Sequence, residues 1–341
     1  MTLHPWLTEG WTQLVALGER LPQALLFAGP PGTGKRDLAD AFAARLLCER
    51  PRTDGHACGA CAACALRLAG NHPDLIVVMP PEKEGGEDGP RSSGQIVIDQ
   101  IRALADALAV TGHQSARRVV VIEPAEAMNV FTANALLKLL EEPPVGCVLI
   151  LVSSTPRHLL PTIRSRCRMW PVARPRAKEV AAWRAEQGAQ DAALLDVVGG
   201  LPLAAGRLAE RGCGTLLARF VRDMVRLPDQ DDAVSLAGQW EKWLKSKEAA
   251  VAGFDMVLLT DWMQRWIADL AALRLGGRIR FFPAQHERIA ALAQRTEISR
   301  IATCYNDFLR IRRVAQHPLN TRLMLEDMLL RYVRALSGTR S

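Results

Sequence analysis

Residues Ala28 to Arg36 read Ala-Gly-Pro-Pro-Gly-Thr-Gly-Lys-Arg, which is the pattern of a phosphate-binding loop. An apolar run precedes the loop and a helical pattern follows it, and the motif needs this context. In such a loop the glycines let backbone N–H groups surround the phosphates of a nucleotide, and the lysine reaches the outer phosphates. The candidate nucleotide-binding residues are therefore Gly29, Gly32, Thr33, Gly34 and Lys35.

The residue after Lys35 departs from the complete motif. A serine or threonine is expected there, because its hydroxyl binds Mg²⁺, whereas this chain has Arg36. A guanidinium has only donors and cannot ligate a cation. The loop is therefore predicted to hold phosphate without placing a metal in the usual way. The sequence leaves open whether ATP or another nucleotide binds there.

A second apolar run, Val119–Ile122, ends at Glu123 and Pro124. In many ATPases such a strand ends in an acidic residue for the metal, and a glutamate that orients the attacking water follows it. Glu123 keeps a carboxylate, but Pro124 has no group that could orient water. Taken alone, this run is better interpreted as an ordinary buried strand. Together with the loop, it indicates a degenerate nucleotide site that contains Glu123.

Four of the eight cysteines lie close together, with the spacing C-x9-C-x2-C-x2-C. Four thiolates are enough to close a tetrahedral Zn²⁺ site, and without an open position the zinc would be structural. Inside a cell such tight spacing favours a metal over disulfides. An iron–sulfur cluster is the alternative, and His56 and His72 are spare ligands. The predicted zinc ligands are Cys48, Cys58, Cys61 and Cys64.

Composition points to a soluble cytoplasmic protein. Apolar residues make up 49% of the 341 residues, but no apolar run approaches the ~20 residues that span a bilayer. The first residues lack the pattern of a signal peptide. The net charge of +7 permits a polyanion partner. Because the excess is mostly arginine in an alanine-rich chain, codon bias explains it equally well.

The order of the patterns predicts an α/β domain followed by helices. Short apolar runs alternate with helical patterns up to about residue 173, as in a parallel sheet with crossover helices. Residues 80–94 are rich in proline, glycine and charge, and are interpreted as a mobile surface loop. After Pro175 only helical periodicity remains, with breaks at Gly199-Gly200 and Pro228-Asp229. The predicted strands are Leu25–Phe27, Leu75–Met79, Val119–Ile122 and Val148–Val152.

Several motifs resemble those of the bacterial clamp-loader subunits of the AAA+ class. They are Pro5–Leu7, the four-cysteine insert, Asn71–Asp74, Asn134–Pro144 and Ser165–Cys167. The resemblance is strong over residues 1–175 and weak in the helical remainder. It implies three domains, which are an AAA+ (RecA-like) domain at 1–173 with a zinc module at 48–64, a small helical lid at 174–210, and a helical oligomerisation collar at 211–341.

The departures from the motor subunits of this family favour one branch of it. Motor subunits of the gamma/tau type need an intact hydroxyl after the lysine, an Asp-Glu pair and an arginine in the lid. This chain has Arg36, Glu123-Pro124 and, near the place of that arginine, Pro202. The resemblance thus implies the delta prime branch, a part of the DNA polymerase III holoenzyme without activity of its own. The alternatives are a gamma/tau-type ATPase and a zinc-containing nucleic-acid-binding protein.

The resemblance also implies partners and a role for Arg166. The expected partners are gamma/tau and delta subunits in a hetero-pentamer, the sliding clamp indirectly, and primed-template DNA within the complex, with no membrane. Arg166, in the Ser-Arg-Cys triplet, is predicted to be an arginine finger that acts on a neighbouring ATPase subunit. The simpler interpretation is a surface arginine paired with a nearby carboxylate.

Overall fold

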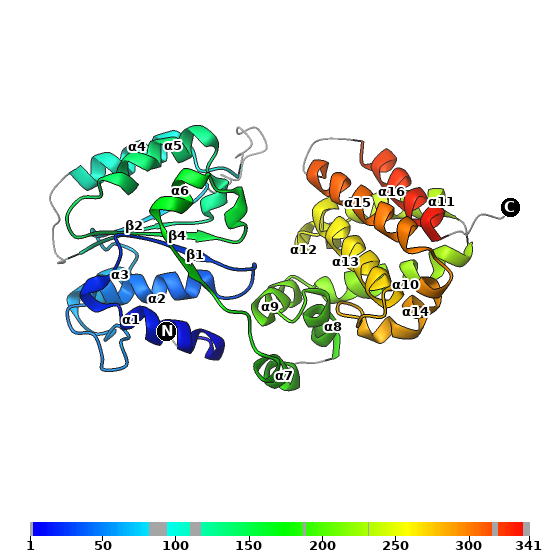
Figure 1. The fold of residues 1–341 in the computed structure, drawn as a ribbon, viewed down its shortest axis with the longest axis horizontal. Helices are drawn as coiled ribbons and strands as arrows, with labels where there is room; N and C mark the ends of the chain where they lie inside the picture. Colours follow the sequence, from blue (N-terminus) through cyan, green and yellow to red (C-terminus); the bar gives the residue numbers. More distant parts are fainter. Residues whose placement is uncertain are drawn as a thin grey trace. The chain divides into compact units, whose positions relative to one another are not determined.

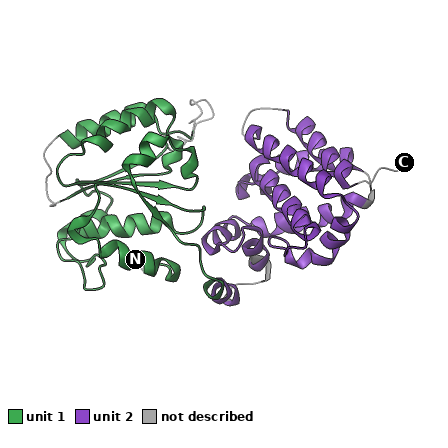
Figure 2. Cartoon of the chain, viewed as in Figure 1, with its two compact units in different colours: residues 1–179 green, residues 180–341 purple. Residues whose placement is uncertain are grey.

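The computed structural model describes residues 3–81, 94–109, 117–186, 189–230, 232–315 and 320–336. The chain divides into two compact units, Met1–Glu179 and Val180–Ser341 (Figure 2). Most of the loop expected at 80–94 lies outside the described residues. Within the described ranges, no helix is long and apolar enough to cross a membrane.

The first unit is built on a five-stranded sheet in the order β2-β3-β4-β1-β5. Every neighbouring pair of strands is parallel, with Leu26 opposite Leu151 and Val120 opposite Leu149 as examples of the register. The predicted parallel sheet is confirmed. Its strands are β1 (Ala24–Ala28), β2 (Leu75–Val78), β3 (Arg118–Ile122), β4 (Cys147–Ser153) and β5 (Arg168–Pro171).

The edge strand β5 is absent from the sequence prediction. Only Trp170 of its four residues is buried, so it lacks the continuous apolar run of the buried parallel strands. Its pairing with β1 fixes the chain directly after Arg166. The sheet is therefore wider by one strand than the hydrophobic pattern predicts.

Helices cover both faces of the sheet (Figure 1). Because side chains alternate along a strand, Leu25 and Phe27 pack against the helices of one face, while Leu26 and Ala28 pack against those of the other. The first face carries α1 (Thr8–Val15), α2 (Lys35–Leu47) and α3 (Ala62–Leu68). The second face carries α4 (Ile98–Ala109), α5 (Val130–Glu141) and α6 (Pro161–Arg166).

The carboxyl ends of β1, β3 and β4 meet at one edge of this sheet, since the strands are parallel. β1 leads into the glycine loop and then α2, and β3 ends next to Glu123. Ligands of open α/β sheets bind at this edge. The topology therefore brings the two nucleotide motifs, which are almost ninety residues apart in the sequence, to the same place.

The second unit is helical, as the sequence predicts, and α7 (Ala177–Glu186) spans its boundary. The predicted break at Gly199-Gly200 is confirmed, because these residues separate α8 from α9. The break predicted at Pro228-Asp229 is wrong: helix α10 contains Pro228 and continues to Gln230, because a proline in the last turn disrupts little of the helix before it. A separate lid at 174–210 stays a prediction. The other helices are α8 (Ala189–Val197), α9 (Pro202–Glu210), α10 (Cys213–Gln230), α11 (Ala233–Leu244), α12 (Lys247–Ala252), α13 (Met256–Arg274), α14 (His286–Gln294), α15 (Ile298–Val314) and α16 (Thr321–Leu336).

Several large aromatic side chains lie in the core of the helical unit. Trp240, Trp262 and Trp266 are buried around Phe220. The indole Nε1 of Trp266 donates a hydrogen bond to the Tyr332 hydroxyl at 2.8 Å, which satisfies a polar group that burial would otherwise penalise. One continuous apolar core thus joins α8 and α9 to the helices that follow them.

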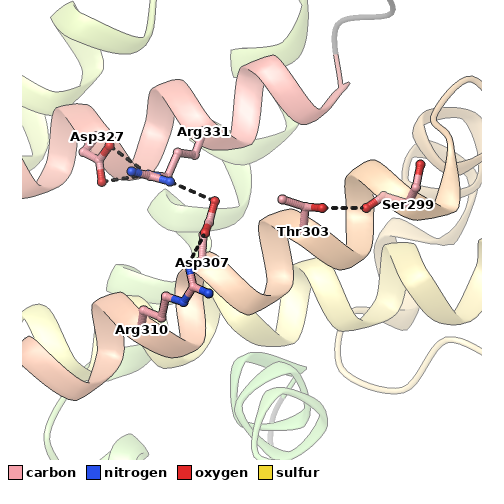
Figure 3. Close-up of polar contacts among 6 residues, drawn as sticks. All are labelled: Ser299, Thr303, Asp307, Arg310, Asp327 and Arg331. Atoms are coloured by element: carbon pink, nitrogen blue, oxygen red, sulfur yellow. Dashed lines mark hydrogen bonds and ion pairs between the residues drawn. The ribbon is translucent and has the colours of Figure 1, made fainter.

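Two further groups of polar contacts, around Asp307 and Asp269, lie in this unit. Asp307 of α15 accepts a 2.9 Å bond from Arg331 of α16 and lies 3.7 Å from Arg310 (Figure 3). Deeper in the unit, the buried carboxylate of Asp269 accepts bonds from the backbone N–H groups of residues 280–282 at 2.8 to 2.9 Å. Burial raises the pKa of Asp269, while these N–H groups act against that rise. The carboxylate thereby anchors a segment that is neither helix nor strand.

Candidate functional site

The glycine loop lies between the end of β1 and the first residue of α2. Gly32 and Gly34 have φ values of 82° and 84°, a region that side chains with a Cβ rarely adopt. A Cβ on Gly34 would lie 2.9 Å from Leu7 Cδ1, and one on Gly29 would lie 2.8 Å from the Val172 carbonyl oxygen. The glycines are therefore needed both for the turn of the loop and for its close packing.

The polar residues of the loop bond to its own backbone. Lys35 is buried, and its Nζ donates to the Pro30 carbonyl oxygen at 2.7 Å. Thr33 Oγ1 donates to the same oxygen at 3.0 Å, and Trp6 Nε1 donates to the Thr33 carbonyl at 3.0 Å. The five predicted nucleotide-binding residues thus form one ordered loop, which the segment around Trp6 helps to hold in place.

Arg36 joins this loop to the second nucleotide motif. Its Nη1 donates to Glu123 Oε2 at 2.6 Å, and its Nε donates to Asp40 Oδ2 at 2.8 Å. Burial alone would lower the pKa of Arg36, but the bonds to Glu123 and Asp40 raise it above the usual value for arginine. The guanidinium therefore stays charged. It forms an ion pair with Glu123, which is the carboxylate that a nucleotide-bound metal would need as a ligand.

The residues at this edge do not fit Mg²⁺. Mg²⁺ requires oxygen ligands at ~2.0–2.1 Å in near-octahedral geometry. Arg36 stands where a hydroxyl ligand is expected, and it engages the only carboxylate that the second motif supplies there. Pro124 follows Glu123 and offers no side-chain donor or acceptor to a water. The geometry favours phosphate binding over phosphoryl transfer.

The sequence analysis missed Glu126, which organises the end of β4. Glu126 Oε1 accepts bonds from the N–H groups of Ser154 at 2.8 Å and Thr155 at 3.3 Å. Ser153, at the end of the strand, is fully buried. A glutamate in a short turn gives no sequence signal of this kind, since its partners lie almost thirty residues away.

The four predicted zinc ligands converge on one point. Their sulfur atoms all lie within 4.8 Å of one another, with 3.9 Å between Cys48 and Cys61 and 3.9 Å between Cys58 and Cys64. A tetrahedral site with Zn–S bonds of ~2.3 Å has sulfur–sulfur distances of about 3.8 Å. The cluster therefore has the donor number and the spacing to hold a metal ion.

Local structure explains this convergence. Cys48 directly follows α2, Cys61 caps α3, and Cys64 lies in the first turn of α3. Backbone N–H groups of Ala60 and Cys61 point at the Cys58 sulfur and lower the pKa of Cys58 to about 6. Such donors stabilise thiolates, which are the form that binds metals.

Neither spare histidine belongs to this cluster within the described part of the chain. The His56 ring stacks on Trp11 at 4.5 Å. The His72 Nδ1 accepts a bond from the Asp74 N–H at 3.1 Å. Both imidazoles therefore have structural contacts, and the sulfur atoms alone form the candidate metal site.

Arg166 is the last residue of α6, and only Cys167 separates it from β5. Its Nη2 lies 2.6 Å from Glu141 Oε1, and its Nη1 donates to the Thr162 carbonyl at 3.1 Å. The side chains of Arg166 and Glu141 are 36% and 50% exposed. The simpler interpretation, an arginine paired with a carboxylate, describes the isolated chain correctly. The pair is open to solvent, so a stronger anion could replace Glu141.

The fold and these sites define the chain as a P-loop protein of the AAA+ type, in which Arg36 follows the P-loop lysine and Pro124 follows Glu123. Residues 11–175 match the family described as DNA polymerase III, delta subunit, and residues 255–334 match the corresponding C-terminal family. The delta' subunit of DNA polymerase III from Pseudomonas aeruginosa is 39% identical over 279 residues, which is 80% of this chain and 78% of that protein.

The delta' subunit from Escherichia coli (strain K12) is 30% identical over 342 aligned residues, which is 97% of this chain and 95% of that protein. The chain belongs to the family of DNA polymerase III delta' subunits, which are clamp-loader components. The tau subunit of Bacillus subtilis is 33% identical over 156 residues, which is only 25% of that protein. The prediction of the delta prime branch over the gamma/tau branch is confirmed.

Proposed function

We propose that this chain is a non-hydrolysing subunit of a cytoplasmic clamp loader. Together with gamma/tau and delta subunits in a hetero-pentamer, it helps to load the sliding clamp onto primed DNA. Family membership supports this role, and the helical residues 211–341 would supply the collar through which the subunits assemble. Its contacts with the clamp and with the primed template would be made within the assembled complex.

The observation that carries the non-hydrolysing role is the ion pair between Arg36 and Glu123. Phosphoryl transfer needs a metal on the phosphates and a positioned nucleophile. Here Arg36 is paired with the Glu123 carboxylate, which is then not free to bind a metal, and Pro124 cannot orient water. The isolated protein should therefore hydrolyse no ATP above background, even when Arg36 is changed to threonine, because Pro124 and Pro202 remain.

The four-cysteine cluster supports a structural Zn²⁺ site as part of this function. Cys48, Cys58, Cys61 and Cys64 would fill all four positions of a tetrahedral ion, which leaves none for substrate. The ion would then tie α2 to α3 on one face of the sheet. Its role would be to stabilise this module rather than to take part in chemistry.

Arg166 is proposed as an arginine finger for the neighbouring ATPase subunit. Such a finger neutralises the charge that develops on the transferred phosphoryl group. In the isolated chain Glu141 holds the guanidinium at 2.6 Å, and the phosphate of the neighbour would replace this carboxylate. Glu141 would then act as a positioning residue, which keeps the arginine extended and ordered until assembly.

The experiment is to reconstitute the complex from its gamma/tau, delta and delta prime subunits with Arg166→Ala. Loss of one finger is worth ~10³–10⁵ at its own site, but the motor subunits act at the other interfaces. The clamp- and DNA-stimulated ATPase rate should fall severalfold, while zinc content and co-elution stay normal. Arg168→Ala is the matched control, because this exposed arginine lies two residues away.

A second variant separates the finger from a merely structural pair. Glu141→Gln removes the charge that holds Arg166, so it should leave assembly intact and change the stimulated ATPase much less than Arg166→Ala does. If Arg166→Ala loads clamps and supports ATP hydrolysis at the wild-type rate, Arg166 is only a surface residue. If the chain does not co-elute with gamma/tau and delta, the proposed role in the loader is wrong.

A further inference from the structure

A fixed positive charge stands where a P-loop ATPase places its metal. Arg36 lies in the first turn of α2, and its Nη1 contacts both Glu123, after β3, and the Met79 sulfur, after β2, at 2.6 and 3.4 Å. A Mg²⁺ ion bound to the same Glu123 oxygen at ~2.1 Å would lie within about 4.7 Å of that nitrogen. Two cations this close repel each other strongly at a partly buried site.

The guanidinium also keeps a donor for a ligand. Its Nε and Nη1 are engaged by Asp40, Glu123 and Met79, whereas Nη2 has no hydrogen-bond acceptor among the residues that the structure describes. The side chain is one-third exposed. Guanidinium groups bind phosphate oxygens through charge-assisted bonds without any metal. The Arg36 guanidinium is thus held in place by its neighbours and still has Nη2 to donate to a ligand.

A cavity of about 420 Å³, within the size range of small-molecule sites, is lined by residues that contact the loop. Trp6, Leu7 and Val172 are among the residues that line it. The same residues touch the loop, since Trp6 bonds to the Thr33 carbonyl and Leu7 lies against Gly34. A ligand with phosphates on the loop would have space for an aromatic base beside an indole.

We propose that this P-loop binds a nucleoside di- or triphosphate in metal-free form, with the Arg36 guanidinium in place of Mg²⁺. The ligand is a nucleoside polyphosphate rather than inorganic polyphosphate, because two indoles, those of Trp6 and Trp170, are among the residues that line the neighbouring cavity. Binding of this kind holds nucleotide without turning it over. The proposal concerns the loop alone and does not depend on the role proposed for Arg166.

The test is calorimetric titration of the full chain with ATP, ADP and inorganic tripolyphosphate, each in EDTA and in excess Mg²⁺. ATP and ADP should bind saturably in EDTA, and Mg²⁺ should weaken the binding of ATP roughly tenfold through repulsion by Arg36. Tripolyphosphate should bind more weakly than ATP. Lys35→Ala should abolish binding, with Lys138→Ala as the control, because Lys138 lies on α5 away from the loop.

The sharpest variant is Glu123→Gln. At a metal-dependent site, loss of this carboxylate would weaken nucleotide binding. Here it removes the charge that neutralises Arg36, so the affinity for ATP in EDTA should rise about three- to tenfold. Arg36→Thr should do the opposite, because it weakens binding in EDTA and leaves no repulsion against Mg²⁺. Circular dichroism and metal content establish that each variant is folded.

Four results would overturn the proposal: no binding of ATP or ADP in EDTA, binding that requires Mg²⁺, weaker binding by Glu123→Gln, or tripolyphosphate bound as tightly as ATP. None of these results would affect co-elution with gamma/tau and delta or the stimulated ATPase of the reconstituted complex. Failure of the metal-free nucleotide site is therefore distinguishable from failure of the clamp-loader role.

Discussion

The four-cysteine cluster and the P-loop edge are the two places in the first unit where a metal could be expected, and they differ in what occupies the centre. At the cluster, four sulfur atoms lie within 4.8 Å of one another, and each of them is a possible metal ligand. At the P-loop edge, the glycine frame is complete, but a guanidinium lies 2.6 Å from the carboxylate. The presence of all the P-loop glycines therefore does not imply that the metal site of a P-loop ATPase is present as well.

The difference shows which residues report on chemistry. Glycines such as Gly34 are required by the backbone and by the packing of Leu7, whether or not a metal binds. The position after Lys35 has no such backbone requirement, so the loss of a metal ligand there is visible only in the chemistry of its side chain. The identity of the residue after Lys35 is thus more informative about activity than the whole glycine pattern before it.

The largest effect should follow from breaking the cluster. Cys61→Ser removes a thiolate and the sulfur that caps α3, so zinc content should fall to background. Structural zinc contributes on the order of 10 kcal/mol to the folding of small zinc modules, so residues 48–68 should become sensitive to protease. Cys147→Ala, a buried cysteine outside the cluster, should keep its zinc. Zinc retained by Cys61→Ser would contradict the four-sulfur site.

A smaller effect is expected when a glycine of the P-loop or of the four-cysteine cluster is replaced by alanine, and its size should differ between the two places. Gly34 and Gly59 both have positive φ, but a Cβ would meet Leu7 at 2.9 Å in the first case and nothing within 4 Å in the second. Gly59→Ala should destabilise by about 1 kcal/mol through backbone strain alone, and Gly34→Ala by about 2–3 kcal/mol. Guanidinium unfolding of the full chain measures both. Equal losses would show that the P-loop is not tightly packed.

The smallest effect concerns the ion pair itself. Arg36→Ala should lower the free energy of unfolding by only about 1 kcal/mol, because partly exposed pairs contribute little and salt screens them. Arg102→Ala, which removes an exposed pair with Asp99, should change it by less than about 0.5 kcal/mol. A loss above about 3 kcal/mol for Arg36→Ala would mean that the arginine is chiefly structural, which would weaken its assignment as a replacement for a metal.

Much of the fold was predictable because its signals are local. Four strands are short apolar runs, and Pro143-Pro144 ends α5 close to where proline requires it. The cysteine cluster was predictable from spacing, since α2 and α3 hold the ligands at their ends. The edge strand β5 was not, because only Trp170 faces the core.

The pairings at the site could not be read from the sequence. Arg36 and Glu123 are 87 positions apart, and Arg166 and Glu141 lie on different helices. The charges of these residues are visible in the sequence, but which carboxylate each arginine meets depends on the order of the strands and on the packing of helices against the sheet. Glu126 was missed for the same reason, since its partners are backbone groups that follow another strand.

The carboxylate of Asp269 has a consequence for how the helical unit would look in solution. Residues 280–282 belong to no helix or strand, and a segment of this kind is usually expected to be a flexible loop. Its three amide hydrogens nevertheless bond to a buried acceptor. In deuterium oxide these amides should exchange on the timescale of the surrounding helices rather than of a loop. Slow isotope uptake would then mark residues 280–282 as part of the cooperative core.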